Sequence, residues 1–248
     1  MSLPATRAAA VDIATAAAPV DALDWAGLAA ALDEWGFATT GRLLDKETCH
    51  ALRECYDDDG LFRSHIVMAR HGFGRGEYKY FTYPLPELIA RLRDRLYAHL
   101  APVANRWLEM SGREDRFPDD HATFLARCHA AGQSLPTPLL LRYGKDDYNC
   151  LHQDLYGAHV FPLQVAVLLS APVAEFEGGE FVLTEQRPRM QSRVGVVPLD
   201  IGEAVIFAVN ERPVTGKRGV YRVRMRHGVS RVRAGQRHVL GIIFHDAA

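Results

Sequence analysis

The spacing of apolar residues divides the chain into a helical first part and a strand-rich second part. Up to about residue 134, apolar positions recur every three to four residues, the period of a helix with one buried face. This pattern predicts helices within 24–37, 45–60 and 85–110. The third of these carries a stripe of leucines that we expect to face the core: Leu88, Leu92, Leu96 and Leu100.

Between the second and third predicted helices, the segment 62–83 alternates in polarity and has glycines near its middle. This pattern predicts two strands joined by a turn, and we expect the resulting hairpin to act as a lid. The glycines are not followed by Gly-Lys-Ser/Thr or by the start of a helix, so a phosphate-binding loop is not predicted.

From Thr137 onward the pattern changes to short apolar or alternating runs separated by turn residues. The runs are PLLLRY, VFPLQVAVLLS, GEFVLTE, VGVVPL, EAVIFAV, VYRVRMRHGVSRV and RHVLGIIFH. Strands of this length and spacing predict an α+β, mainly β fold: a double-stranded β-helix (jelly roll, cupin-like) with the N-terminal helices packed on it. We therefore expect a flexible leader over 1–22, a helical region with the hairpin lid over 23–134, and a jelly-roll catalytic core over 135–248, with helices and core in one structural unit.

Composition sets broad limits on the partners of this chain. It has 248 residues, 48% of them hydrophobic, with a net charge of −1 and a pI near 6.8. A globally basic nucleic-acid-binding protein is not indicated by this balance. From Arg187 to Arg237, however, twelve Lys or Arg residues stand against three acids. This segment forms either a solvated face or a surface for an anionic substrate or cosubstrate.

The cellular location is also constrained by composition. The four cysteines form no Cys-x-x-Cys pair, which suits a reducing cytoplasm. The Ala-rich N-terminus is interrupted by Asp12, so we interpret it as a leader rather than a signal peptide. No apolar run approaches the length of a membrane span. We expect a cytoplasmic protein without membrane contact, and the sequence predicts no particular oligomeric state.

Candidate metal ligands emerge from strand alternation. Side chains in 220–229 alternate between two faces, so His227 shares its face with apolar residues and three arginines share the other. A buried imidazole is costly unless it binds a metal or a hydrogen-bond partner. His152 and Asp154, at i and i+2 of an extended segment, also point to one side.

Together, His152, Asp154 and His227 make a set of two histidines and one carboxylate. Such a set occupies one face of an octahedron and leaves three positions open, as in non-haem Fe(II) oxygenases. The alternatives are ordinary core histidines, or a Zn²⁺ site with an open water position.

Along its predicted strand, Arg237 lies on the same face as Val239, Gly241 and Ile243. We therefore expect it to face inward beside this set. A buried guanidinium favours a carboxylate, which it grips with two hydrogen bonds. A 2-oxo dicarboxylic acid would chelate the metal with one end and meet Arg237 with the other, and Tyr143 would donate a second hydrogen bond. The alternatives are an interstrand salt bridge for Arg237 and core packing for Tyr143.

Several stretches carry a family resemblance, namely RYGKDDYNCLHQD, GGEFVLTEQRP, PLDIGEAVIFAVN and RHGVSRVRAGQRHVLGIIFHD. Over residues 137–246 they resemble the prolyl-hydroxylase-like type of 2-oxoglutarate- and Fe(II)-dependent dioxygenases. From about Trp25 the chain is similar to a bacterial family of oxygenases proposed to demethylate damaged nucleic acid (AlkB-like).

The resemblance implies His152, Asp154 and His227 as iron ligands, Arg237 as the anchor of the cosubstrate 2-oxoglutarate, and Tyr143 as a helper. It also implies O2-dependent oxidation of a C–H bond, by hydroxylation or oxidative N-demethylation, that produces succinate and CO2. One position departs from the pattern, because relatives often have Ser or Tyr where His238 follows the anchor.

The primary substrate remains open at this stage. Candidate substrate contacts lie in the hairpin and after the GGEFVLT strand: Arg63, Met68, Lys79, Tyr80, Glu185 and Arg187. They could clamp a phosphate backbone while a flipped base stacks in the site, or could bind an acidic metabolite or peptide. The hypotheses are thus an oxygenase of alkylated nucleic acid, a hydroxylase of a small molecule or amino-acid side chain, and, more remotely, a Zn-dependent hydrolase or a non-catalytic cupin-like metal-binding protein.

Overall fold

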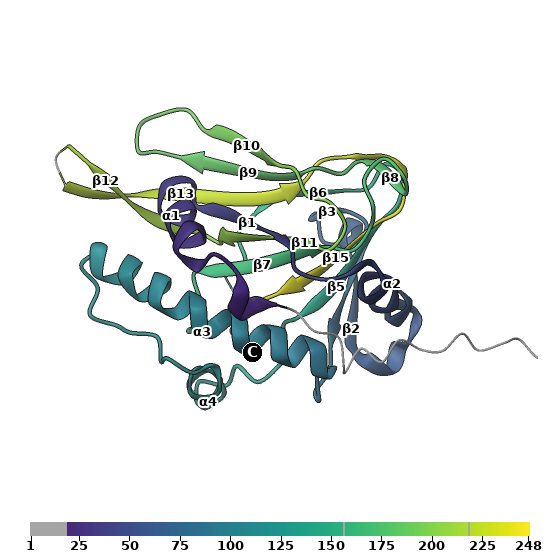
Figure 1. The fold of residues 1–248 in the computed structure, drawn as a ribbon, viewed down its shortest axis with the longest axis horizontal. Helices are drawn as coiled ribbons and strands as arrows, with labels where there is room; N and C mark the ends of the chain where they lie inside the picture. The colour runs from purple at the N-terminus through teal and green to yellow at the C-terminus, as the bar shows by residue number, and fades with distance from the viewer. Residues whose placement is uncertain (1–18, 156, 218) are drawn as a thin grey trace, which may run out of the picture.

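Two antiparallel sheets face one another, and helices cover the outer side of the larger sheet (Figure 1). The structure is a computed structural model that describes residues 19–155, 157–217 and 219–248. Residues 1–18 of the predicted leader therefore lie outside the described residues, and its end forms a short 3-10 turn, Val20–Ala22. No helix of the described residues has the length and apolarity needed to cross a membrane.

The larger sheet has seven strands in the order β1-β11-β7-β15-β5-β4-β2. These are β1 (Phe37–Arg42), β11 (Glu203–Ala208), β7 (Leu163–Leu168), β15 (Arg237–Ile242), β5 (Leu139–Tyr143), β4 (Glu77–Phe81) and β2 (Phe62–Val67).

The smaller sheet has the order β10-β9-β13-β6-β3, with β12 paired to β13. Its strands are β10 (Arg193–Val197), β9 (Phe181–Gln186), β13 (Gly219–Val229), β6 (Tyr148–His152), β3 (Gly74–Arg75) and β12 (Glu211–Gly216). A separate two-stranded ladder joins β14 (Val232–Gly235) to β8 (Phe176–Gly178).

The predicted helices are present as α1 (Trp25–Trp35), α2 (Lys46–Glu54) and α3 (Glu87–Met110), and a further helix, α4 (His121–Ala130), follows. Local sequence explains where α1 and α2 begin and where α1 ends. The Asp24 and Asp45 side chains accept hydrogen bonds from backbone N–H groups in the first turns of α1 and α2. Gly36 ends α1 in the left-handed region, at φ 78°.

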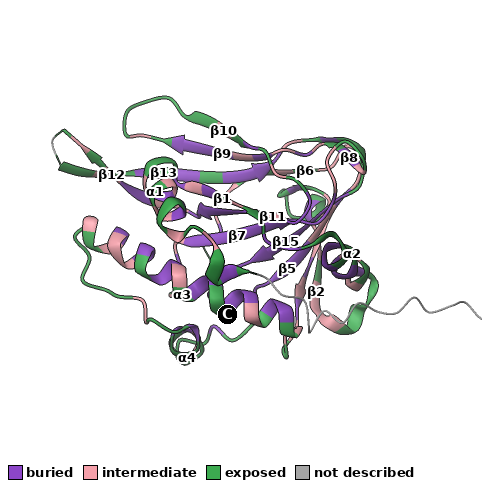
Figure 2. Ribbon diagram, in the orientation of Figure 1, coloured by how far each residue is buried: buried purple, intermediate pink, exposed green. Residues whose placement is uncertain are grey.

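Burial is greatest at the centre of the larger sheet, where both faces are covered (Figure 2). All six residues of β7 and of β15 are buried, as expected for strands between two layers. The outer face packs on the leucine stripe of α3, which is at most 1% exposed, as its spacing predicts. The inner face meets β9 of the smaller sheet through a second apolar cluster. Alternation along β13 also places Val223, Met225 and His227 inside, as predicted.

The segment predicted as a hairpin lid is built into both sheets. β2 and β4 pair with each other, and β4 extends the larger sheet by pairing Tyr78 with Leu141 and Tyr80 with Leu139. Between them, β3 joins the edge of the smaller sheet. The segment therefore bridges the two layers on one side of the sandwich instead of simply covering it. Its main-chain hydrogen bonds to β5 and β6 hold it there, and these partners lie about 60 to 75 residues away in the sequence.

Buried histidines make the stability of this fold depend on pH. Burial lowers the pKa of His121, His238 and His245 to about 4. Because these values lie below that of an unfolded histidine, the unfolded state binds more protons as the pH falls. The stability contributed by neutral histidine is complete above about pH 6.5 and is lost as the pH falls towards 4, at up to roughly 1.4 kcal/mol per pH unit for each histidine.

We therefore expect urea denaturation to give a free energy of unfolding that falls steeply from about pH 6.5 to about pH 4. His121 bonds the Phe244 carbonyl at 2.7 Å, and His121→Gln retains a donor for it while removing one titrating group. This variant should have a shallower slope than the parent protein, because it removes one of the groups that bind more protons in the unfolded state. His50→Gln, at an exposed position of α2, is the control and should leave the slope unchanged. An equal slope in all three proteins would contradict the prediction.

Candidate metal centre

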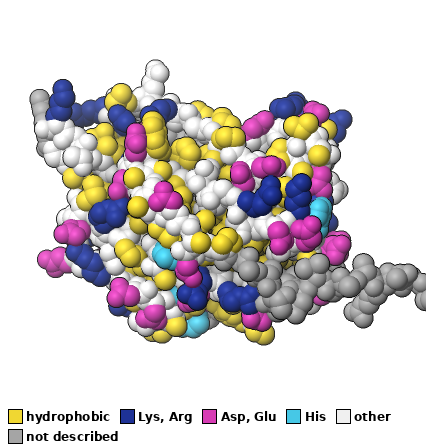
Figure 3. All heavy atoms as spheres, viewed as in Figure 1, with side chains coloured by type: hydrophobic (Ala, Val, Ile, Leu, Met, Phe, Trp, Pro, Cys, Tyr) yellow, Lys and Arg dark blue, Asp and Glu magenta, His cyan; other side chains and the backbone are white. Residues whose placement is uncertain are grey.

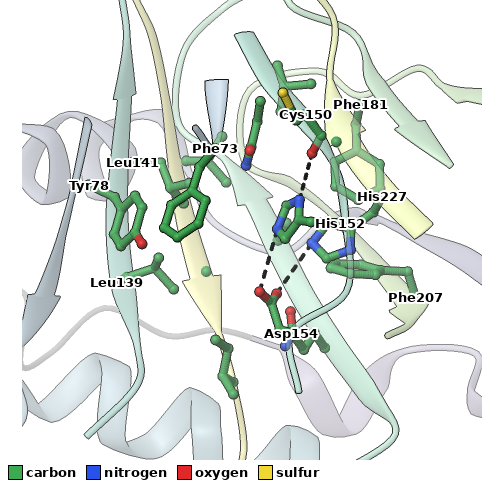
Figure 4. Close-up of a pocket in the computed structure, with 18 of the residues that line it drawn as sticks. Phe73, Tyr78, Leu139, Leu141, Cys150, His152, Asp154, Phe181, Phe207 and His227 are labelled. Carbon is green, nitrogen blue, oxygen red and sulfur yellow. Dashed lines mark hydrogen bonds and ion pairs between the residues drawn. The ribbon is translucent and has the colours of Figure 1, made fainter. Parts of the chain in front are cut away.

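Three side chains from two neighbouring strands of the smaller sheet converge at one point (Figure 4). His152 ends β6, and the strand register places it directly opposite His227 of β13. Asp154 follows two residues after His152 and turns its carboxylate between the two imidazoles. Its oxygens lie 3.5 Å from His152 Nε2 and 3.4 Å from His227 Nε2. The structure therefore brings together the three residues that the sequence predicts as ligands.

The orientation of each imidazole suits a metal ligand. His152 Nδ1 lies 2.8 Å from the Cys150 carbonyl, which fixes Nδ1 as the donor and leaves the Nε2 lone pair directed at the carboxylate. Burial, followed by the neighbouring His227, lowers the pKa of His152, and this favours the neutral form that binds metals. His227 packs against the Phe207 ring at a centroid distance of 4.6 Å.

The donor set fits a divalent ion. Each of the three residues offers one ligand atom, and these three atoms lie within 4.8 Å of one another. Asp154 and His227 are each only 7% exposed. Two imidazole nitrogens and a carboxylate oxygen suit Fe(II), Mn²⁺ or Zn²⁺, and three protein ligands leave coordination positions open. These positions face a cavity rather than the protein core.

The cavity has a volume of about 370 Å³ and lies between the two sheets. The metal-ligand set lines one side of it, and inward-facing residues of β15, Val239 and Gly241 among them, line another. Its wall is mainly apolar, and Arg237 and Tyr143 supply polar groups within it. A concave apolar site with a few convergent polar groups is typical of small-molecule recognition.

Arg237 is a buried cation whose guanidinium lacks partners in the described part of the protein at two of its nitrogens. It is 3% exposed, and its Nε and Nη1 atoms have no hydrogen-bond partner within the described residues. Burial lowers its pKa to about 10, so it remains charged at neutral pH. The predicted alternative, an interstrand salt bridge, is not formed with any described residue. An unpaired buried charge is costly, so the residue fits an anionic ligand that enters the cavity.

Tyr143 lies opposite Arg237 in the β5–β15 ladder, and the guanidinium carbon is 5.7 Å from the centre of its ring. Burial raises the pKa of Tyr143, so its hydroxyl stays protonated and can donate a hydrogen bond. Asn149 Nδ2 lies 3.5 Å from that hydroxyl, at the limit of a hydrogen bond. Tyr143 therefore combines core packing with a polar group that faces the cavity.

Three amide side chains that sequence analysis did not select also line the cavity: Asn149, Gln153 and Gln164. Gln164 is 4% exposed, and its Nε2 has no hydrogen-bond partner in the described part of the chain. A signal was present in the sequence, because Gln164 interrupts the apolar run VFPLQVAVLLS. A polar residue inside a strand buried on both faces requires a partner, and a ligand in the cavity can provide one.

The predicted substrate contacts separate into two groups. Tyr80 lines the cavity, and the Arg63 guanidinium lies 4.6 Å above its ring while bonding the Pro136 carbonyl. Arg187 lies on the outer side of the smaller sheet, where it pairs with Glu185 at 2.9 Å.

Met68, Lys79 and Glu185 do not reach the cavity. Lys79 alternates with Tyr80 on β4 and turns to the opposite side, where its Nζ bonds the Tyr56 carbonyl and Asp59. Glu185 is 4% exposed and is held by a buried ion pair with Arg212, and Met68 is fully buried. Since these groups already have protein partners, we leave them out of the proposed substrate surface.

His238, the departure from the family pattern, faces away from the cavity. Alternation along β15 turns it to the side opposite Arg237, where its backbone N–H donates to Ser170 Oγ and its Nδ1 lies 3.4 Å from that oxygen. It therefore has no direct contact with a ligand beside Arg237.

Aromatic residues that the sequence analysis did not select also border the site. Phe73 and Tyr78 line the cavity on the side of the bridging segment, and Figure 4 shows the Phe73 ring between Tyr78 and the metal-ligand set. Phe73 is 48% exposed, which places it at the mouth, whereas Tyr78 comes from β4 within the larger sheet. Phe181 and Phe207 pack on the opposite side, next to His227.

Comparison with known proteins identifies the family. Residues 76–247 match the model of a family described as an oxygenase catalysing oxidative methylation of damaged DNA. The chain belongs to this oxygenase family. Over 168 residues it is 49% identical to the uncharacterized proteins Rv2227 and MT2286 of two Mycobacterium tuberculosis strains, covering 68% of this chain and 72% of theirs.

Solved structures show that oxygenases of this kind share the fold. A 2OG-Fe(II) oxygenase-family oxidoreductase from Burkholderia pseudomallei superposes with a TM-score of 0.52 at 17% identity, covering 90% of this chain and 93% of that one. A prolyl-4-hydroxylase from Pseudomonas putida gives 0.50 at 13% identity, covering 90% and 99%. The predicted oxygenase family and the double-stranded β-helix fold of 2-oxoglutarate- and Fe(II)-dependent enzymes are thereby confirmed.

Proposed function

We propose that this oxygenase uses Fe(II), 2-oxoglutarate and O2 to remove methyl groups from damaged DNA by oxidation. One observation carries the proposal: the His152, Asp154 and His227 donors face a cavity that also contains the unpaired Arg237 guanidinium. When bound, iron and 2-oxoglutarate supply the oxidation of a C–H bond by O2, with succinate and CO2 as co-products. A hydroxylated N-methyl group leaves as formaldehyde, so the net change on the base is demethylation.

The residues of the chain have distinct proposed roles in this chemistry. His152, Asp154 and His227 would hold the metal through Nε2, a carboxylate oxygen and Nε2. Arg237 would bind the distal carboxylate of 2-oxoglutarate with its planar fork, and the protonated Tyr143 hydroxyl would donate to the same ligand. The apolar wall excludes water from the reacting centre and so strengthens these charged contacts.

The aromatic groups on the side of the bridging segment would position the base. Phe73 and Tyr78 contribute rings to the cavity wall, and a methylated base extruded from its stack presents a flat π-surface to them. Stacking of this kind contributes about 1–3 kcal/mol per base and tolerates different sequences.

A zinc hydrolase, the remoter alternative, fits these residues less well. Two histidines and a carboxylate can hold Zn²⁺ with a reactive water, but that reaction has no use for a buried, unpaired guanidinium in the same cavity. Hydroxylation of a small molecule uses the same residues as DNA demethylation and is separated from it only by the choice of substrate.

The test is turnover with defined substrates. The purified protein, loaded with Fe(II) under exclusion of air, is mixed with 2-oxoglutarate, O2 and a single-stranded oligonucleotide that contains N-methylated bases. We expect formation of succinate above the level without DNA, together with an equal amount of formaldehyde. The unmethylated oligonucleotide is the matched control. Succinate formation that methylated DNA does not stimulate, but that a panel of small molecules does, would replace the DNA substrate with a small-molecule one.

Within the same assay, Phe73→Leu tests the proposed stacking. Leucine keeps an apolar side chain of similar reach but removes the ring face. We expect kcat/KM for methylated DNA to fall about 5- to 150-fold, the equivalent of 1–3 kcal/mol, while DNA-independent succinate formation stays unchanged. Equal kcat/KM values for the variant and the parent protein would exclude Phe73 as a stacking residue.

A further inference from the structure

The outer face of the smaller sheet carries a concentration of arginines that the proposed active site does not use. We call it the arginine face and define it by Arg187, Arg189, Arg222, Arg224 and Arg226. With Thr184, Gln186, Ser192 and the single acid Glu211, they border a hollow of about 440 Å³. The chain as a whole has a net charge of −1, so this face is locally distinct.

The fold assembles the arginine face from separate segments. Alternation along β13 points Arg222, Arg224 and Arg226 outward, at a spacing of about 7 Å between successive guanidinium-bearing residues. The β9–β13 ladder places Gln186 beside Arg224 and Thr184 beside Arg226, which adds polar side chains on the same face. The connection from β9 to β10 then brings Arg187 and Arg189 to the rim.

Part of this positive charge is not neutralised within the protein. Arg187 pairs with the buried Glu185 at 2.9 Å. Glu211 pairs with Arg222 at 3.0 Å and lies 3.9 Å from Arg224, although both arginine side chains are more than 60% exposed. Within the part of the chain that the structure describes, no carboxylate lies within 4.0 Å of Arg189 or Arg226. Neighbouring like charges repel one another, and an anion on this face would remove that repulsion.

The position of the arginine face relates it to the metal centre. Arg226 immediately precedes His227, so the two side chains lie on opposite sides of the same strand. In Figure 1 the β12–β13 hairpin and the β9–β10 connection project at the same end of the molecule. Figure 3 shows Lys and Arg side chains gathered at that end, at the upper left. Arg226 is therefore one sheet thickness away from the metal-ligand set, and Arg224 and Arg222 follow it along β13 towards the β12–β13 hairpin.

The arrangement favours a long polyanion over a small one. A single phosphate or carboxylate would meet one or two guanidinium groups, whereas the three β13 arginines alone span about 13 Å. DNA presents one phosphate per 3.4 Å of each strand, so a stretch of this length offers several phosphates in a row. Arginine binds phosphate oxygens with two parallel hydrogen bonds, which suits such a contact.

We propose that the arginine face binds the phosphate backbone of the DNA strand on one side of the target base, while the base itself enters the cavity on the inner side of the sheet. This inference rests on the proposed function, which makes DNA the substrate. The face then contributes affinity that does not depend on base sequence and holds the strand next to the metal centre.

The test measures DNA binding separately from catalysis. Fluorescence anisotropy follows a labelled, unmethylated single-stranded oligonucleotide titrated with metal-free protein over a range of salt concentrations. The variant carries Arg222→Gln, Arg224→Gln and Arg226→Gln. The matched control carries Arg91→Gln, Arg95→Gln and Arg113→Gln, which remove the same charge from exposed positions on and just after α3.

We expect the β13 variant to bind DNA about tenfold more weakly or worse at moderate salt, and its slope of log K against log salt to become shallower by about 2, as expected for three lost phosphate contacts. The α3 control should keep the slope of the parent protein. A further variant with lysine at the same three β13 positions retains the charge and should restore most of the affinity. Identical slopes for the β13 variant and the α3 control would overturn the proposal, as would failure of the parent protein to bind the oligonucleotide at low salt.

Turnover of a methylated mononucleotide separates this inference from the proposed function. The mononucleotide has no flanking backbone, so the β13 variant should oxidise it as fast as the parent protein does and should lose activity only on long DNA. Loss of activity on both substrates would assign the arginines a structural role and contradict the inference. If the parent protein binds DNA through these arginines but never demethylates it, the proposed function fails while the binding surface stands.

Discussion

His227→Ala should abolish oxygenase turnover by removing one of the three proposed metal ligands. His227 supplies a buried Nε2 beside Asp154, and alanine leaves an incomplete donor set that holds the ion weakly. Bound metal contributes several kcal/mol to catalysis, so we expect substrate oxidation to fall by about a thousandfold or more. Anaerobic addition of Fe(II) and 2-oxoglutarate to the parent protein should produce a visible metal-to-ligand absorption band, and the variant should lack it.

The matched control for this substitution is His50→Ala. His50 is an exposed histidine of α2, so its removal makes the same chemical change without touching the site. Both variants should retain the circular dichroism spectrum of the parent protein, because the His227 side chain contributes to one wall of a cavity rather than to a continuous core. An absorption band of normal intensity in folded His227→Ala protein would contradict the proposed metal centre.

Arg237→Met should have two opposite effects, on ligand binding and on stability. Removing one partner of a buried charged hydrogen-bonded pair costs about 2–5 kcal/mol, so the Kd of 2-oxoglutarate should rise about 30-fold to several thousandfold. In the ligand-free protein, however, the guanidinium is buried with two unpartnered nitrogens. Methionine fills a similar volume without that penalty, so the free energy of unfolding should increase by roughly 1–3 kcal/mol.

A second buried arginine provides the contrast. Arg212 is 1% exposed, forms an ion pair with Glu185 and donates to the Asp33 and Glu34 carbonyls at the end of α1. Arg212→Met removes these contacts and leaves the buried Glu185 with only the more exposed Arg187 and Arg193 as partners, so it should destabilise the protein by up to about 3–5 kcal/mol. Calorimetric titration of 2-oxoglutarate and urea denaturation of both variants measure the two effects. Arg237→Met protein that is destabilised as strongly as Arg212→Met, with unchanged 2-oxoglutarate affinity, would assign Arg237 a purely structural role.

The convergence of His152, Asp154 and His227 and the inward position of Arg237 could be predicted from the sequence because each depends on a local rule. Alternation along a strand determines which side chains share a face, and that rule places His227 and Arg237 inward and Arg222, Arg224 and Arg226 outward. The spacing of His152 and Asp154 likewise directs both to one side. Periodicity also predicted three helices and the strands of the core, because their apolar positions repeat without interruption.

The bridging segment and its aromatic residues were decided only in three dimensions. Alternation in 62–83 predicts strands but does not specify which face of which sheet they extend, because strand partners lie far away in the sequence. Pairing of β4 with β5 is what turns Tyr78 and Tyr80 into the cavity and Lys79 away from it. The edge strand β1, with the mixed sequence FATTGR, has no clear alternation and was not predicted.

By itself, therefore, the sequence determined the chemistry of the centre: two histidines, a carboxylate and an inward arginine on strands of known parity. The tertiary structure decided which other residues surround that chemistry. Glu185 shows the limit most clearly, since its charge predicts an exposed contact, whereas the fold buries it against Arg212. The face of a strand that a side chain occupies follows from alternation along the strand itself. Whether that side chain is buried depends on what packs against it, and that partner comes from elsewhere in the chain.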